Sequence, residues 1–94
     1  MGIIWDPAKH AWLVRHWGIS LDEVAGCILR KEYKAVLENP SRPGQMVFVL
    51  EYKGYTHVAP FVVDAEKNIV LKTVFPSRRF HRLYGGGDHE EARA

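Results

Sequence analysis

The chain has 94 residues, 47% of them hydrophobic, and 13 Lys and Arg against 11 Asp and Glu give a formal net charge of +2. This composition indicates one small domain with a single core and excludes two separate cores. The single cysteine, Cys27, excludes an internal disulfide, and no apolar run approaches the about 20 residues that span a membrane. Because the N-terminus also lacks the pattern of a secretion signal, we expect a cytoplasmic protein without a membrane partner.

A first helix is predicted to begin at Asp6 and Pro7. Aspartate accepts hydrogen bonds from the free amides of a first turn, and proline is preorganised for the first helical position. The helix should run to about Trp17 and end at Gly18, which suits a left-handed residue. Its apolar residues lie on two sides, so it either packs between two layers or presents Trp12 and Trp17 to a protein partner.

A second helix is predicted from Ser20, because Glu23 three residues later completes a capping box. Leu21 and Val24 begin an apolar pattern at helical spacing, and the charged residues stay off that face. This amphipathic helix is expected to pack on the core and to contribute no chemistry.

After Lys31 the apolar pattern changes to period two, which predicts a four-stranded antiparallel meander. The expected strands are residues 33–38, 46–52, 55–63 and 69–75. Lys53-Gly54 is a tight hairpin connection, and Pro60 should occupy a bulge or a position whose amide is not needed. Residues 3–5 are either a short extended segment or an apolar lead-in to the first helix. We expect residues 1–84 to form one domain and residues 85–94, which begin with three glycines, to form a flexible tail.

Positive charge is concentrated after the fourth strand, in a segment that contains Arg78, Arg79, His81, Arg82 and Tyr84. Ser77 is predicted to cap a short helix there, whose apolar stripe of Phe80, Leu83 and Tyr84 docks on the sheet. The basic side chains then project on the opposite side, where they suit a phosphate-rich ligand. A solvated basic surface at a helix end is the alternative. The prediction is an α+β fold with two N-terminal helices, the meander and a short basic C-terminal helix.

Eight short motifs follow one another along the chain, and each occurs once. They are Trp5-Asp6-Pro7-Ala8-Lys9, Gly18-Ile19-Ser20, Asp22-Glu23-Val24, Asn39-Pro40, Pro43-Gly44-Gln45, Pro60-Phe61-Val62, Leu71-Lys72-Thr73 and Pro76-Ser77-Arg78-Arg79. Together with the predicted element order, they resemble small toxin ribonucleases of the RelE-like class, and most closely the BrnT-type toxins of bacterial toxin–antitoxin pairs. The motifs up to Val24 carry the BrnT-type resemblance, and those from Asn39 onward resemble a related branch of small toxins. The chain departs from that pattern where Trp17 stands between His16 and Gly18.

The resemblance implies a metal-independent endoribonuclease that cleaves messenger RNA and inhibits growth. It implies no cofactor, and it implies a cognate antitoxin partner that carries a ribbon-helix-helix DNA-binding module. Cleavage of this kind needs positive charge on the phosphorane and groups that move protons. Arg78, Arg79 and Arg82 are candidate stabilisers of the phosphate. His81 is a candidate acid or base, and Tyr84 stacks on a base or assists proton transfer.

Several alternatives stay open at this stage. Tyr84 lies on the stripe already assigned to packing, and Lys72 either reaches the same phosphate or extends into solvent. His57 is expected to be a structural histidine within its strand. No histidine pair has metal-ligand spacing, so we expect no metal site.

Two other functions remain for the same fold. A noncatalytic protein- or RNA-binding module would keep the partner surface of Trp12 and Trp17 without cleavage. A DNA-binding repressor fits less well, because neither of the first two helices offers a base-reading face.

Overall fold

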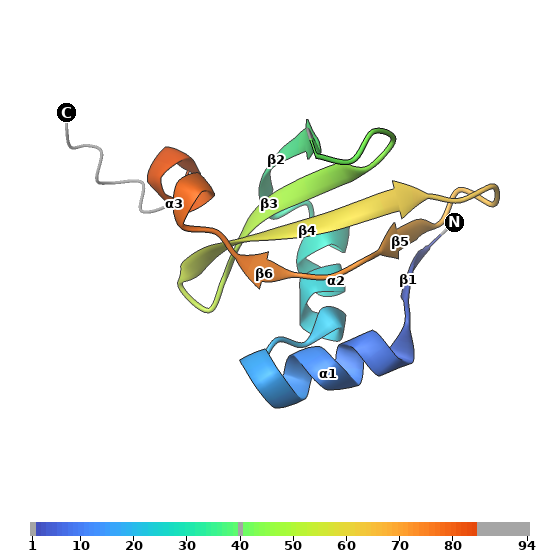
Figure 1. Ribbon diagram of the computed structural model, residues 1–94, viewed down its shortest axis with the longest axis horizontal. Helices are drawn as coiled ribbons and strands as arrows, with labels where there is room; N and C mark the ends of the chain where they lie inside the picture. Colours follow the sequence, from blue (N-terminus) through green and yellow to red (C-terminus); the bar gives the residue numbers. More distant parts are fainter. Residues whose placement is uncertain (1, 40, 85–94) are drawn as a thin grey trace.

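The computed structural model describes residues 2–39 and 41–84 (Figure 1). Its elements are, in chain order, β1 (Ile3–Trp5), α1 (Pro7–Trp17), α2 (Leu21–Leu29), β2 (Tyr33–Glu38), β3 (Met46–Tyr52), β4 (Tyr55–Val63), β5 (Ile69–Leu71), β6 (Phe75–Pro76) and α3 (Arg78–Tyr84). The expected α+β class is confirmed. None of the helices in these residues is long and apolar enough to cross a membrane. The predicted tail, residues 85–94, lies outside the described residues.

The strands form one mixed sheet with the order β1-β5-β4-β3-β2, and β6 pairs with β4 beside β5. The prediction of a purely antiparallel, four-stranded meander is therefore wrong in two respects. First, β1 adds a parallel edge strand, with Ile3 opposite Ile69. Its place is secured by the side chain of Asn68, which accepts a hydrogen bond from the Gly2 amide at 2.9 Å. Second, the predicted strand 69–75 is divided into β5 and β6.

Pro60 explains why this strand is divided. Its carbonyl accepts a hydrogen bond from the Lys72 amide at 2.8 Å, so its nitrogen also faces the β5 side of β4. Proline has no N–H, and a strand alongside finds no donor at this position. Residues 72–74 leave the ladder, and pairing resumes where His57 and Val58 of β4 meet β6. Pro60 thus occupies a position where its amide is not needed, as expected.

The predicted helix caps are present. Asp6 accepts a hydrogen bond from the Ala8 amide at 3.0 Å, and Gly18 ends α1 with a φ of 68°. Ser20 accepts one from the Glu23 amide at 3.4 Å. The Tyr52 hydroxyl completes this capping arrangement, because it accepts a hydrogen bond from the Ser20 amide at 3.0 Å and donates one to the Glu23 carboxylate. The start of α2 is thereby tied to β3.

The core lies between the sheet and helices α1 and α2 (Figure 1). Alternate residues of β3 and β4, such as Phe48, Leu50 and Phe61, point into this core. The intervening residues face the other side of the sheet, where α3 packs against β4. Both faces of the central strands are therefore covered, and the sheet edge at the β5–β6 break lies between the two layers of helices.

Candidate functional site

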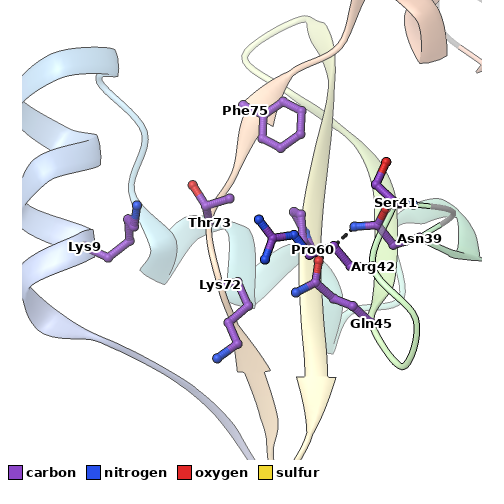
Figure 2. Close-up of a pocket in the computed structure, with 9 residues that line it drawn as sticks. All are labelled: Lys9, Asn39, Ser41, Arg42, Gln45, Pro60, Lys72, Thr73 and Phe75. Atoms are coloured by element: carbon purple, nitrogen blue, oxygen red, sulfur yellow. Dashed lines mark hydrogen bonds between the residues drawn. The ribbon is translucent and has the colours of Figure 1, made fainter.

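A cavity of about 550 Å³ opens at the break between β5 and β6 (Figure 2). Three elements each contribute one cation to its wall: Lys9 from α1, Arg42 from the β2–β3 loop and Lys72 from the segment after β5. The remaining wall residues are neutral: Asn39, Ser41, Gln45, Pro60, Thr73 and Phe75. No carboxylate of residues 2–39 and 41–84 lines this cavity, so its described wall suits an anionic group.

The loop that carries Arg42 is held in shape by hydrogen bonds at its base. The Asn39 amide group donates to Gln45 Oε1 at 2.8 Å, the contact drawn as a dashed line in Figure 2. Asn39 Oδ1 accepts from the Ser41 amide at 3.0 Å, and Gly44 supplies the positive φ that closes the turn. These contacts position the loop across the cavity from α1.

The cations of this cavity have no carboxylate partner within residues 2–39 and 41–84. The ion pairs found there join His10 to Asp22 and Arg30 to Glu32, both away from the cavity wall. Lys9 instead places its ammonium 5.5 Å from the centre of the Trp12 ring. A bound anion would therefore supply these three cations with a partner that the described carboxylates do not provide.

A second cavity, of about 220 Å³, continues from the first toward α3. Both cavities share Asn39, Ser41, Pro60 and Phe75 in their walls. The second adds Arg79 and Phe80 of α3, together with one carboxylate, Glu38. We call the two cavities together the cationic groove, with Lys9, Arg42, Lys72 and Arg79 as its cations. Phe75, whose side chain is 42% exposed, belongs to both halves.

The cationic helix α3 begins as predicted, because Ser77 Oγ accepts a hydrogen bond from the Phe80 amide at 3.2 Å. Its predicted apolar stripe is wrong at Leu83, which is 65% exposed, whereas Phe80 and Tyr84 are half-buried. His81 faces the sheet in place of Leu83. The His81 ring stacks on Tyr55 with 4.0 Å between ring centres. The buried Thr56 supplies the polar partner that favours an imidazole over leucine at this contact.

The hydrogen bonds of His81 indicate its tautomer. Its Nδ1 lies 3.0 Å from Thr56 Oγ1 and 3.4 Å from the Thr56 backbone nitrogen. A backbone N–H can only donate, so Nδ1 is the acceptor and the proton of the neutral ring is carried by Nε2. His81 thus anchors α3 through Nδ1 and through its stack on Tyr55.

The other predicted site residues are divided between the groove and the surface of α3. Lys72 and Arg79 line the cationic groove. Arg78 and Arg82 are exposed on α3 and are not part of its walls, and Tyr84 is half-buried with its ring centre 6.0 Å from that of Phe80. The structure therefore brings Lys72 and Arg79 to one groove and leaves the remaining arginines beside it.

Sequence reasoning did not find Lys9, Arg42 or Phe75 as site residues. They come from three distant segments, and only folding places them together. The signals available were the lysine that follows Trp5-Asp6-Pro7-Ala8 and an arginine within a turn-rich loop. Neither pattern by itself indicates a shared cavity.

The surface of α1 is aromatic and exposed. Trp12 is 46% exposed and Trp17 is 54% exposed, and Leu13 is the buried residue of this helix. Trp12 packs against His16, with 4.6 Å between ring centres. Of the two arrangements considered for this helix, packing between two layers is excluded and an open aromatic surface is observed.

The histidine of β4 has the structural role expected from its strand position. His57 is buried, and its Nδ1 lies 2.9 Å from the Tyr55 carbonyl. Its ring also packs in a T-shaped arrangement with that of Tyr52, with ring centres 5.4 Å apart. Within the part of the chain that the structure describes, no three His, Cys, Asp or Glu side chains gather to form a metal site.

Comparisons of this chain with protein-family models, with curated proteins and with solved structures give no match. The cationic groove and the residues of α3 are therefore the observations from which a function can be inferred.

Proposed function

We propose that this protein is the toxin of a type II toxin–antitoxin pair, a cytoplasmic, metal-independent endoribonuclease that cleaves messenger RNA and inhibits growth. The observation that carries the proposal is the cationic groove, which runs from α1 to the arginine-rich α3. Among the residues that the structure describes, its walls hold four cations and one carboxylate, Glu38. Such a groove favours a polyanion, and the two aromatic side chains in its walls suit the bases of a nucleic acid.

The proposed reaction is attack of an RNA 2′-hydroxyl on the adjacent phosphorus. The O2′–P bond forms and the P–O5′ bond breaks, which leaves a 2′,3′-cyclic phosphate and a free 5′-hydroxyl. The proton lost from O2′ passes to a base, and the departing O5′ gains one from an acid. His81 is assigned the acid role in its imidazolium form, in which Nδ1–H donates to Thr56 Oγ1 and Nε2–H is the proton given to O5′.

Positive charge is required where the phosphorane gathers negative charge. We assign the phosphate contact to Lys72 and Arg79, because both line the groove, and further donors to Arg78 and Arg82 beside it. Tyr84, packed near Phe80, is assigned to stacking or to assisting proton transfer. Removal of one such donor from a transition state costs about 10²- to 10³-fold in kcat.

The test is cleavage of RNA by the purified chain in the presence of EDTA, with the new 5′ ends mapped. Arg78→Ala and Arg82→Ala should each reduce cleavage by about 10²-fold or more and relieve growth inhibition while the domain stays folded. Arg30→Ala is the matched control, because Arg30 is exposed and paired with Glu32 outside the groove. Wild-type cleavage by both folded α3 variants would remove these arginines from the mechanism, and cleavage only with added Mg²⁺ would refute metal independence.

The partner in this proposal is a cognate antitoxin, a protein with a ribbon-helix-helix DNA-binding module, that covers the aromatic surface of α1. Trp12 and Trp17 are large, exposed side chains of the kind that anchor protein interfaces. Co-expression of the neighbouring open reading frame should suppress toxicity, and a Trp12→Ala, Trp17→Ala variant should escape that suppression. A Val63→Ala variant, altered at an exposed apolar residue of β4, should remain suppressed.

A noncatalytic binding module is the second candidate. The observation in its favour is that both proposed proton-transfer residues also have packing roles: His81 stacks on Tyr55, and Tyr84 lies beside Phe80. This candidate predicts RNA association without new RNA ends, whereas the nuclease predicts both. The cleavage assay in EDTA therefore separates the two functions.

A further inference from the structure

The break between β5 and β6 divides the cationic groove into two positively charged halves with an aromatic residue at their junction. Lys9, Arg42 and Lys72 belong to the larger half, and Arg79 belongs to the smaller. Phe75 lines both. The alternation of cation, aromatic ring and cation along one path matches the alternation of phosphate, base and phosphate along a single nucleic-acid strand.

The larger half is suited to a phosphate group. Its three cations come from separate elements and none is paired with a carboxylate within the described chain. A volume of about 550 Å³ also leaves room for a ligand larger than a bare ion. Thr73 and Gln45 add neutral hydrogen-bonding groups to the wall.

Phe75 is suited to a base that has left its stack. It lies in β6, which pairs with β4 through Val58, so its backbone is held while its side chain stays 42% exposed. In a duplex both faces of a base are stacked on neighbouring bases, and only its edges are accessible to a protein. A single strand can place an unstacked base flat against an aromatic ring.

We propose that single-stranded RNA crosses the sheet edge at the β5–β6 break. One phosphate lies among Lys9, Arg42 and Lys72, the adjoining base stacks on Phe75, and the next phosphate meets Arg79. This path deepens the proposed nuclease function and rests on it for the identity of the strand. On this path Lys9, Arg42 and Phe75 contact the substrate, and the strand continues from them to α3.

The experiment measures binding of a 2′-O-methyl hexanucleotide, which lacks the attacking hydroxyl and cannot be cleaved. Affinity is followed by calorimetry across a range of KCl concentrations. Each phosphate contact on a single strand contributes about 0.7 to the slope of log K against log salt. Lys72→Gln and Arg42→Gln should each reduce that slope by about 0.7, whereas Lys34→Gln on β2, outside both cavities, should leave it unchanged.

Phe75 is tested with a second pair of ligands. Phe75→Leu should weaken binding of the hexanucleotide by about 5- to 150-fold without a change in slope, the range expected for one base stacked on an aromatic side chain. It should not weaken binding of a hexamer whose residues are abasic, and Phe75→Trp should retain wild-type affinity. Equal losses for both hexamers would overturn the stacking role.

Other ligands test the remaining parts of the proposal. Duplex RNA or uridine monophosphate bound as tightly as the hexanucleotide would overturn the single-strand path. An acidic peptide bound as tightly, and insensitive to Phe75→Leu, would assign the groove to a protein ligand instead. If the wild-type protein cleaves RNA but Lys72→Gln keeps the wild-type slope of log K against log salt, the strand path is refuted and the nuclease function is not. Normal binding with no cleavage of RNA by the wild type would refute the nuclease alone.

Discussion

Substitution of His81 separates its role as an anchor from its role in catalysis. In His81→Ala the stack on Tyr55 and the hydrogen bond to Thr56 are both lost. In His81→Asn the side-chain oxygen can take the place of Nδ1, so the bond to Thr56 is kept and the ring is lost. The two variants therefore differ in how well α3 docks, and neither has an imidazole.

The magnitude follows from those two contacts. An aromatic pair contributes about 0.5–1.5 kcal/mol beyond its area. The lost hydrogen bond contributes about 0.5–1.5 kcal/mol, with more when a buried partner is left unsatisfied, and Thr56 is only 1% exposed. We expect His81→Ala to reduce the free energy of opening α3 by about 2 kcal/mol and His81→Asn by about 1 kcal/mol.

Hydrogen exchange measures this opening directly at the α3 amides of Phe80 and His81, which bond to Ser77. A loss of 2 kcal/mol corresponds to about 30-fold faster exchange. Cleavage is then measured on the same samples, and His81→Asn should lose about 10²- to 10⁴-fold although its helix remains docked. Wild-type exchange in His81→Ala would refute the anchoring role, and wild-type cleavage by His81→Asn would refute the acid role.

Four further predictions concern stability. Tyr52→Phe should lower the free energy of unfolding in urea by about 1–2 kcal/mol, because it removes the hydrogen bonds of the Tyr52 hydroxyl to the Ser20 amide and the Glu23 carboxylate. The control, Tyr33→Phe, should be near neutral, and equal losses in both variants would contradict the role of these two bonds. Burial, and after it the hydrogen bond to Glu23, raises the pKa of Tyr52 above its ordinary value of 10.0. The stabilisation from the Tyr52 hydroxyl is therefore complete below pH 10 and is lost as pH rises through the pKa of Tyr52 in the folded protein. An NMR titration that gave the ordinary pKa for Tyr52 would contradict this. The hydrogen bond from the Asn68 backbone amide lowers the pKa of Asp64 below its ordinary value of 3.8. The stability that Asp64 contributes to the β4–β5 turn is therefore present above pH 3.8 and is lost as pH falls through the pKa of Asp64 in the folded protein. NMR of the carboxyl group and hydrogen exchange in this turn should show both changes. Gly54→Ala should lower the free energy of unfolding in urea by about 1–2 kcal/mol, because alanine is strained at the φ of 81° that Gly54 adopts. An added Cβ would meet no other atom within 4 Å, so the loss would come from the backbone alone, and no loss would show that the turn relaxes.

Local signals predicted the helices and the hairpin because each depends on residues close together in the chain. Asp6 and Ser20 form their caps with amides two and three residues away, and Lys53-Gly54 turns with both φ angles positive. These interactions are set by side-chain chemistry and by glycine's backbone freedom. The α+β class follows from the same patterns.

Longer-range features needed the tertiary structure. The period-two pattern of residues 69–75 cannot show that Pro60, in a neighbouring strand, interrupts their pairing. Helical spacing predicts which residues of α3 share a face, but only Tyr55 and Thr56 determine that His81 is the one turned toward the sheet.

By itself, the sequence determined where the helices begin, where the first one ends and where three of the strands lie, because caps, turns and alternation act over a few residues. Only the tertiary structure decided that β1 joins the sheet in parallel and that Lys9, Arg42 and Lys72 share one cavity. These residues are separated by about 30 positions each in the chain, and their proximity results from packing the helices and the loop around a broken strand. The charge of the site is therefore readable from the sequence, whereas its shape is a property of the fold.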